Sequence, residues 1–398
     1  MPRQITEAYV VAATRVAVGK APRGVYRHTR PDDLLAHVLA SVLAQVPSIA
    51  PARVDDVIVG CAMPEYEQGM NVARIGLLLA GLPDSVAGMT VNRFCASGLN
   101  AVSIAADRIR VGEADIMIAG GTESMSMIPM LGRLAINQRV FAREETIGIA
   151  YGMGLTAERV ATRWKVSRED QDAFALASHQ KAIAAQAAGE FAQEITPFVL
   201  DAREPDLASG AIVATRHAVP ADEGPRADTS LEALAKLRPV FAAKGSVTAG
   251  NSSQTSDGAG AAILVSERVL KELALAPLAR FAGFAIAGVP PDIMGIGPVA
   301  AIPKVLAGAG VRKQDLDWIE LNEAFAAQSL AVIRDLDLDV AKINPLGGAI
   351  ALGHPLGATG AIRTATIVHG LRRRRHKWGL VTMCIGTGMG AAGLFESL

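Results

Sequence analysis

The sequence predicts an α/β protein that contains a duplicated half. Short runs rich in β-branched residues at 56–59 and 115–118 end in glycine and alternate with longer helical patterns. The same arrangement returns near the C-terminus, where residues 317–321 resemble the first run and residues 379–383 the second. Both correspondences are offset by roughly 260 residues, which indicates an internal repeat.

Length and composition place the chain among globular proteins. It has 398 residues, of which 50% are hydrophobic, enough for two or three domains with a sizeable core. Lys+Arg and Asp+Glu number 39 each, and this balance argues against a surface built for nucleic acid or anionic membrane. No apolar run approaches the ~18 residues of a membrane span. Three cysteines and no signal-peptide pattern favour a reducing, cytoplasmic location.

The middle of the chain differs in composition from both ends. Residues 122–247 contain a Met-rich stretch, a helix with Ser167 and Asp170 as a capping box, and a polar stretch with prolines at 201–226. The Met-rich stretch fits either core filling or a pliable ligand wall. We predict three parts: an N-terminal half at 1–121 that is completed by 248–271, an inserted loop domain at 122–247, and a C-terminal half at 272–398.

Cys95 is the first candidate for chemistry. A strand is expected to end near Arg93, and a helical stripe follows at Leu99, Val102, Ala106 and Ile109. Cys95 therefore lies at a helix N-terminus, where unpaired N–H groups and the helix dipole favour a thiolate. Small neighbouring residues leave room for a substrate, whereas Cys61 is expected to be an inert core residue.

Three further segments place reactive or polar residues beside glycines and strand ends. His354 lies in the glycine-rich stretch at 344–360, where the following proline keeps it out of helical geometry. The alternative, a phosphate-binding loop, matches neither the P-loop nor the dinucleotide spacing. Asn322 follows the strand at 317–321 and fits a plain helix cap equally well. Cys384 precedes glycines whose backbone N–H groups can approach a ligand oxygen.

In order and over the whole chain, these segments resemble the signature blocks of the thiolases. Residues 120–126, 250–253 and 257–259 resemble further blocks of that family. The resemblance implies a thiolase fold, in which two βαβαβαββ halves form a five-layered αβαβα core with an inserted loop domain. It also implies a retro-Claisen cleavage, in which a thiolate attacks a 3-ketoacyl-CoA, acetyl-CoA departs, and CoA collects the acyl group.

The resemblance assigns roles residue by residue. Cys95 is then the nucleophile, His354 the group that activates it, and Cys384 the acid/base at the acetyl-CoA Cα. His354 and a water held by Asn322 would stabilise the enolate, while the N–H groups of Cys95 and Gly386 would form a second oxyanion hole. CoA and substrate contacts are expected at Ser253, Arg226, Met153 and Phe325. The resemblance implies CoA as co-substrate, with no metal and no permanently bound cofactor.

One departure from the family pattern bears on the subclass. Short-chain biosynthetic acetoacetyl-CoA thiolases carry a histidine in the loop before residues 153–158, where this chain has Gly152. The resemblance therefore favours a degradative 3-ketoacyl-CoA thiolase of fatty-acid β-oxidation, with acetyl-CoA C-acetyltransferase as the alternative. A decarboxylating ketoacyl synthase would place a histidine at Asn322. A noncatalytic lipid- or CoA-binding relative would lose at least one of Cys95, His354 or Cys384.

The expected partners are CoA, acyl-CoA and other copies of this chain. We expect a homodimer or homotetramer, with a hydratase–dehydrogenase subunit as a further candidate partner, and neither nucleic acid nor membrane. The basic run at 372–377 follows a helical pattern, so we interpret it as a solvated cap at a helix C-terminus.

Overall fold

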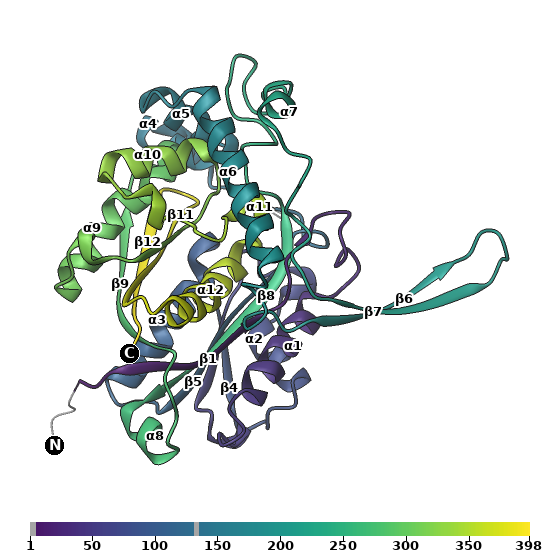
Figure 1. Ribbon diagram of the computed structural model, residues 1–398, viewed down its shortest axis with the longest axis vertical. Coiled ribbons are helices and arrows are strands. Elements are labelled where there is room, and N and C mark those ends of the chain that lie inside the picture. The colour runs from purple at the N-terminus through teal and green to yellow at the C-terminus, as the bar shows by residue number, and fades with distance from the viewer. Residues whose placement is uncertain (1–4, 131–134) are drawn as a thin grey trace.

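The structure is a computed structural model that describes residues 5–130 and 135–398, and its centre is one large mixed sheet (Figure 1). The strand order is β10-β11-β12-β9-β1-β8-β5-β3-β4, and β2 pairs with β8. The strands are β1 Ala8–Arg15, β2 Gly19–Lys20, β3 Asp56–Gly60, β4 Ala87–Val91, β5 Ile116–Ser124, β8 Ser256–Ser266, β9 Ala279–Gly288, β10 Trp318–Leu321, β11 Trp378–Ile385 and β12 Met389–Glu396.

The two halves of this sheet repeat each other strand for strand. β3 pairs in parallel with β5, and β10 pairs in parallel with β11. Val57 lies opposite Ile118 and Ile319 lies opposite Leu380, a separation of 61 residues in both pairs. β8 pairs antiparallel with β5, and β12 pairs antiparallel with β11, so β8 and β12 occupy equivalent positions in the two halves. The pairing of β1 with β9 joins the halves. The predicted repeat is therefore confirmed. In the second half, the strand that would correspond to β4 is reduced to one parallel bridge, between Ile319 and Ile343.

Helices lie between and outside the two halves of the sheet. The helices are α1 Pro31–Ala44, α2 Val72–Leu79, α3 Ser97–Arg110, α4 Glu144–Ile147, α5 Met153–Arg163, α6 Arg168–Ala187, α7 Leu231–Ala235, α8 Glu267–Glu272, α9 Gly297–Ala309, α10 Ala326–Leu336, α11 Ala349–Leu352 and α12 Thr359–Arg374. α3 and α12 pack on each other and on strands of both halves, while α1 and α2 cover the first half. α9 and α10 cover the second half, so the predicted five-layered αβαβα core is confirmed.

The predicted apolar stripe on α3 points into this core. Leu99, Val102, Ala106 and Ile109 are all buried. The crossing of α3 and α12 is close because glycines line it, and a Cβ on Gly360 would lie 2.1 Å from the backbone nitrogen of Leu99. This close crossing brings the start of α3, beside Cys95, next to the start of α12, beside His354.

The chain between β5 and β8 contains α4 to α7 and the hairpin of β6 Phe198–Pro205 with β7 Ile212–Val219, which extends away from the body (Figure 1). The predicted cap of α6 is present, since Ser167 Oγ accepts a hydrogen bond from Asp170 N at 3.0 Å. β5 runs to Ser124, so the first residues of the predicted insertion belong to the sheet. Residues 131–134 of that insertion lie outside the described residues.

One described segment has the length and apolar composition of a membrane span. Residues Pro291–Ala309 have a mean hydropathy of 1.3 over their best window, half of which is buried. The segment is not one continuous helix, because Ile293 has non-helical backbone angles where a 3₁₀ turn meets α9. Ile302 and Val305 of α9 pack in the apolar cluster with Leu380 and Leu394, as in the core helix of a globular protein.

The basic run lies where the sequence predicted a helix end. α12 ends at Arg374, and Arg375 adopts the left-handed conformation that terminates it. Arg373 and Arg374 both pair with Glu190, at 2.5 and 3.4 Å, while Arg372 is exposed.

Candidate active site

The predicted catalytic side chains meet at one cavity of about 440 Å³. Cys95 of the first half and His354 and Cys384 of the second half line it directly. The segment between β5 and β8 closes the cavity with Met153 and Phe241. Residues more than 250 positions apart in the chain are thus brought together by the packing of the two halves.

Cys95 lies in a 3₁₀ turn, Phe94–Ala96, that leads directly into α3. Burial raises the pKa of its thiol to about 12, although the backbone N–H of Gly386 donates to the sulfur and acts in the opposite direction. A helix N-terminus contributes at most about 2 kcal/mol, which is less than the cost of burying a thiolate here. The N–H groups at the helix start lower the pKa of Cys95, as the sequence indicated, but burial outweighs them, and we expect a neutral thiol at neutral pH.

His354 is held as a neutral imidazole. Its Nδ1 lies 2.6 Å from Thr359 Oγ1, whose hydroxyl donates in turn to the carbonyl of Pro355 at 3.2 Å. The side-chain NH₂ group of Asn322 can only donate a hydrogen bond, and its Nδ2 lies 3.3 Å from Nε2 of His354. Nε2 therefore accepts, and the ring proton is on Nδ1. Burial, with a smaller effect of Arg363, lowers the pKa of His354 to about 3. Nε2 is thus unprotonated, the state in which a histidine can act as a base, and His354 lines the same cavity as Cys95.

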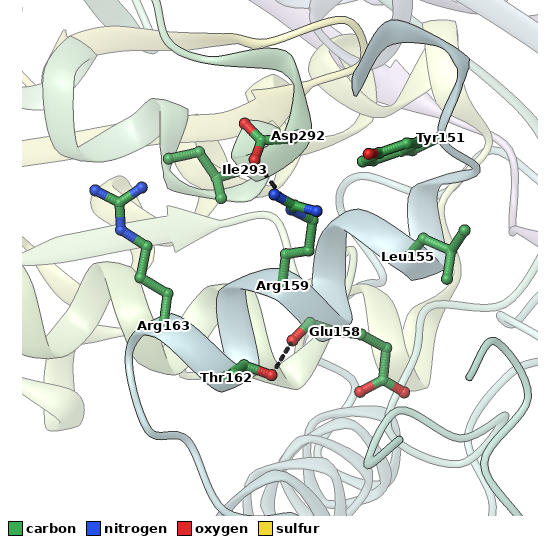
Figure 2. A pocket seen from close by; sticks show the side chains of 8 residues that line it. All are labelled: Tyr151, Leu155, Glu158, Arg159, Thr162, Arg163, Asp292 and Ile293. Carbon is green, nitrogen blue, oxygen red and sulfur yellow. Dashed lines mark hydrogen bonds and ion pairs between the residues drawn. The ribbon is translucent and has the colours of Figure 1, made fainter. Parts of the chain in front are cut away.

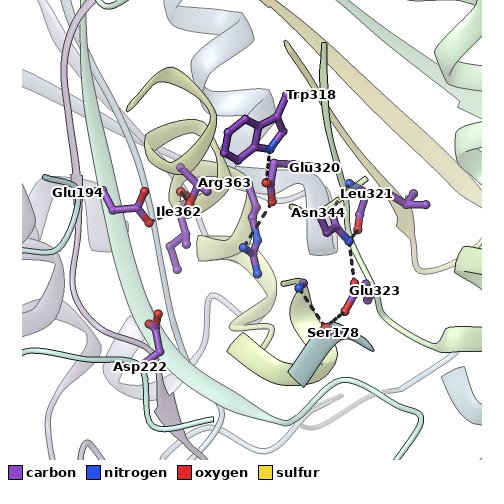
Figure 3. A network of polar contacts seen from close by, with 12 residues as sticks. Ser178, Glu194, Asp222, Trp318, Glu320, Leu321, Glu323, Asn344, Ile362 and Arg363 are labelled. Carbon is purple, nitrogen blue, oxygen red and sulfur yellow. Dashed lines mark hydrogen bonds and ion pairs between the residues drawn. The ribbon is translucent and has the colours of Figure 1, made fainter. Parts of the chain in front are cut away.

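The loop that carries His354 is fixed by side chains from elsewhere in the chain. Glu323 Oε2 accepts hydrogen bonds from Ile350 N at 3.2 Å and from Ser178 Oγ of α6 at 2.6 Å. Ser178 Oγ also accepts from Gly348 N at 3.0 Å, and Asn344 Nδ2 donates to Glu323 Oε1 at 2.8 Å (Figure 3). Gly348 permits this contact, because a Cβ there would lie 2.1 Å from the Glu323 carboxyl carbon.

Glu123 at the end of β5 fixes the other side of the same loop. Its Oε2 accepts hydrogen bonds from Gly357 N at 2.8 Å and from Ala62 N at 2.7 Å. The amide of His354 itself donates to Ser256 Oγ at 3.1 Å. The backbone around His354 is therefore held on both sides by buried carboxylates, which are strong acceptors in a site that excludes water.

Cys384 and Gly386 lie at the end of β11. Cys384 is fully buried, and burial raises the pKa of its thiol, with the neighbouring Cys95 adding to the rise. Cys384 is therefore a proton donor at rest. The backbone N–H of Gly386 donates to the sulfur of Cys95, and a Cβ on Gly386 would lie 3.7 Å from the ring of Phe94 and 3.8 Å from Met153 Sδ.

Asn322 lies beneath His354 and is not a helix cap. The N-cap of α10 is Phe325, so the alternative of a plain cap is wrong. The side-chain oxygen of Asn322 is buried and accepts no hydrogen bond from the described protein groups. Its amide nitrogen is directed at His354. The oxygen is an acceptor and is thus available to hold a water beside the imidazole, and such a water can donate a hydrogen bond to a ligand oxygen.

The predicted CoA contacts divide between two cavities. Ser253, Met153 and Phe325 line the catalytic cavity. Arg226 does not, because it lies in a second cavity of about 400 Å³ and pairs with Asp228 at 2.9 Å. The two cavities share Gln254, and the second also contains Lys20 and His179. This places two cationic groups, Lys20 and Arg226, in a cavity next to the catalytic one. Among the described residues, no group of three or more His, Cys, Asp or Glu is arranged to hold a metal.

Four residues that position His354 and its loop were not recognised as functional in the sequence: Glu123, Glu323, Ser256 and Thr359. The contacts of Glu123 and Ser256 with the His354 loop span 234 and 98 residues of sequence, so no local pattern reveals them. Thr359 carries the one local signal, a hydroxyl five residues after the histidine at the first turn of a helix.

The comparisons with known proteins agree with this geometry. The family models for the thiolase N-terminal and C-terminal domains match residues 8–268 and 275–397. The chain is 49% identical to a 3-ketoacyl-CoA thiolase of Bacillus subtilis (strain 168), over 98% of this chain and 99% of that protein. Its structure matches the Bacillus anthracis acetyl-CoA acetyltransferase with a TM-score of 0.89 at 37% identity, covering 100% of both chains. It matches human mitochondrial 3-ketoacyl-CoA thiolase with a TM-score of 0.88 at 39% identity, covering 99% of each chain. The chain therefore belongs to the thiolase family.

Proposed function

We propose that this chain is a 3-ketoacyl-CoA thiolase that uses CoA to cleave 3-ketoacyl-CoA into acetyl-CoA and a shortened acyl-CoA in fatty-acid β-oxidation. The observation that carries the proposal is one cavity lined by two buried thiols, Cys95 and Cys384, and a buried neutral imidazole, His354. Cleavage of a carbon–carbon bond beside a thioester needs a nucleophile, a base and a separate proton donor, and these three groups supply them. The similar 3-ketoacyl-CoA thiolase of Bacillus subtilis supports this reaction class.

The first half-reaction forms an acyl-enzyme. Cys95 Sγ attacks the 3-keto carbon as its proton moves to Nε2 of His354. The bond between Cα and the attacked carbon then breaks, the acyl group stays on Cys95, and the acetyl-CoA enolate takes the proton of Cys384. The N–H group of Gly386, which donates to the Cys95 sulfur at rest, stabilises the oxyanion of the tetrahedral intermediate.

The second half-reaction restores both thiols. CoA gives its proton to the thiolate of Cys384, and its sulfur attacks the acyl group on Cys95. The departing Cys95 thiolate takes back the proton held by His354. During the first half-reaction, the protonated Nε2 of His354 and a water held by Asn322 donate to the enolate oxygen, and each such donor is worth roughly 3 kcal/mol in comparable sites.

The space at Gly152 supports the degradative subclass. A Cβ on Gly152 would meet nothing within 4 Å, and the backbone there has φ −62°, which any residue can adopt. The cavity therefore has room where the short-chain enzymes carry a histidine. Each buried CH₂ of an acyl chain adds about 0.8 kcal/mol of binding, so chains longer than four carbons are expected to be favoured.

Thiolysis of 3-ketoacyl-CoAs of four to sixteen carbons, followed by loss of substrate, tests the proposal. We expect kcat/KM to rise from acetoacetyl-CoA toward chains of medium length. The second candidate is an acetyl-CoA C-acetyltransferase, which the match to the Bacillus anthracis acetyl-CoA acetyltransferase favours. Activity confined to acetoacetyl-CoA would select that candidate, and cleavage of no 3-ketoacyl-CoA would refute both.

The proposed setting is a cytoplasmic homodimer or homotetramer with CoA as its co-substrate. The predicted division into two halves and an inserted domain fits an enzyme whose halves supply the chemistry and whose insertion covers the substrate. Light scattering on the purified protein measures the number of subunits. Co-purification with a hydratase–dehydrogenase subunit at native expression levels tests the remaining candidate partner.

A further inference from the structure

A third cavity, of about 500 Å³, adjoins the catalytic cavity near Gly152. Figure 2 shows residues that line it, among them Leu155, Arg159 and Asp292. Leu155 lines both cavities. Tyr151 and Ile293 line the third cavity, while their chain neighbours Gly152 and Met294 line the catalytic one. The two cavities are therefore separated by no more than the thickness of these residues.

The partition between the two cavities is weak at Gly152 and Leu155. Gly152 has no side chain, and the space where its Cβ would project is open. The side chain of Leu155 is 42% exposed, so it is not locked in a packed core. An acyl chain that extends past Gly152 therefore meets one adjustable side chain and then enters the third cavity.

One face of α5 forms a wall of the third cavity. Leu155, Arg159, Thr162 and Arg163 are spaced four, seven and eight residues along the helix, which places them on one side. Figure 2 shows Arg159 between this helix and Asp292, with Tyr151 at the end near Leu155. The lining changes along the helix from apolar at Leu155 to cationic at Arg163.

The charges of this lining leave one cation without a counter-ion. Asp292 Oδ2 pairs with Arg159 Nε at 3.0 Å. The carboxylate of Glu158 accepts hydrogen bonds from the backbone nitrogens of Ser246 and Val247, both at 2.9 Å, and is thereby occupied. Arg163 forms no ion pair with any residue that the structure describes, and its guanidinium lies 5.2 Å from the ring centre of Trp164.

We propose that the third cavity binds the distal end of 3-ketoacyl chains that terminate in a carboxylate, with Arg163 as the counter-ion. This inference rests on the proposed function, because it extends the acyl site of that reaction. The guanidinium fork matches a carboxylate with two parallel hydrogen bonds. Leu155 and Arg163 are eight residues apart, about 12 Å along the helix axis, so acetoacetyl-CoA is too short to reach Arg163.

The test compares pairs of 3-ketoacyl-CoAs of equal length, from six to twelve carbons, that end in a carboxylate or in a methyl group. At low salt, the wild-type kcat/KM is expected to favour the carboxylate member by up to about fivefold once the chain is long enough to reach Arg163. The preference is expected to shrink as NaCl is raised, because an exposed ion pair is screened. Arg163→Ala is expected to reduce the ratio to about one, and Arg163→Lys to retain part of it.

Two further variants make the result specific. Arg312→Ala removes an exposed arginine that is not on α5. Arg312 pairs with Asp315 in the turn before β10, so this variant is expected to keep the wild-type ratio. Gly152→His fills the passage and is expected to lower the ratio of kcat/KM for each long substrate to that for acetoacetyl-CoA. Each variant is measured as the ratio of kcat/KM for two substrates. A lower fraction of folded protein changes both values equally and leaves the ratio unchanged.

The possible failures are distinguishable. If the wild type cleaves methyl-terminated chains but shows no preference for the carboxylate at any length, the inference is refuted and the proposed function stands. A preference that survives in Arg163→Ala refutes Arg163 as the counter-ion. Cleavage of neither substrate, nor of acetoacetyl-CoA, refutes the proposed function itself.

Discussion

Two regions of the active site are built in opposite ways. We call the His354 loop, with Cys95 and Cys384, the catalytic floor, and we call the start of α5, with Gly152 and Leu155, the acyl wall. The floor is buried, and its backbone groups are held by long-range hydrogen bonds to Glu123 and Glu323. The wall is exposed at Leu155 and open at Gly152. The reaction and the choice of substrate are thus set by separate parts of the chain.

The difference has an energetic consequence. Removing one partner from the floor leaves a buried polar group without its hydrogen bond, at a cost of about 1–3 kcal/mol. A change in the wall alters contacts to single methylene groups, each worth about 0.8 kcal/mol. Changes in the floor are therefore expected to affect kcat for every substrate, and changes in the wall to redistribute kcat/KM among substrates.

The largest expected effect is at Cys384. Cys384→Ala removes the proton donor of the enolate, so turnover is expected to fall by about 10²–10⁴-fold. Steady-state thiolysis of a medium-chain 3-ketoacyl-CoA measures the loss. Cys61→Ala is the control for loss of a buried thiol: Cys61 does not line the catalytic cavity and makes one long hydrogen bond, 3.8 Å to Glu123 Oε1, so its removal should cost far less turnover. Near-normal turnover in Cys384→Ala would remove Cys384 from the mechanism.

The protonation state of the floor gives a pH prediction. Since burial raises the pKa of Cys95 to about 12, the thiolate fraction of the free enzyme should grow about tenfold for each unit of pH below that value. The rate of Cys95 alkylation by iodoacetamide, followed by peptide mass spectrometry, should therefore rise from pH 7 to 10 without a plateau. A plateau that begins near neutral pH would show a resting thiolate–imidazolium pair instead.

Loss of the Glu323 contact is expected to have an intermediate effect. Glu323→Gln keeps the shape but replaces one acceptor with a donor that opposes Ile350 N or Asn344 Nδ2. We expect kcat to fall by about 10–100-fold with little change in KM, because the His354 loop shifts while the acyl wall is intact. Glu267→Gln, at an exposed site on α8, is the control. A lower melting temperature with unchanged kcat would assign Glu323 a purely structural role.

The smallest expected effect is in the acyl wall. Gly152→His adds a side chain where φ is −62°, so the backbone is not strained. The ratio of kcat/KM for an eight-carbon substrate to that for acetoacetyl-CoA is expected to fall several-fold, since about 0.8 kcal/mol is lost for each methylene that is displaced. Gly152→Ala adds a smaller side chain, so its ratio should lie between that of the wild type and that of Gly152→His. An unchanged ratio in Gly152→His would mean that acyl chains do not pass this residue.

The same contrast explains which features could be predicted from the sequence. The duplicated strands and the α3 stripe were predictable because hydrophobic periodicity is local, and Cys95, His354 and Cys384 because each lies in a distinctive block. Glu123 and Ser256 were not, because their contacts with the loop depend on how distant segments pack. The net pKa shift of Cys95 could not be predicted, because a helix start is visible in a sequence whereas the burial that outweighs it is not.

Covalent acylation tests the central claim, that Cys95 is the nucleophile of the catalytic floor, most directly. The enzyme is mixed with a medium-chain acyl-CoA in the absence of free CoA, and the intact mass of the protein is measured. The account predicts that wild type and Cys384→Ala each gain one acyl group, located on Cys95 by peptide mapping, while Cys95→Ala gains none. Acylation of Cys95→Ala at the wild-type level, or of wild type at another residue, would contradict the account.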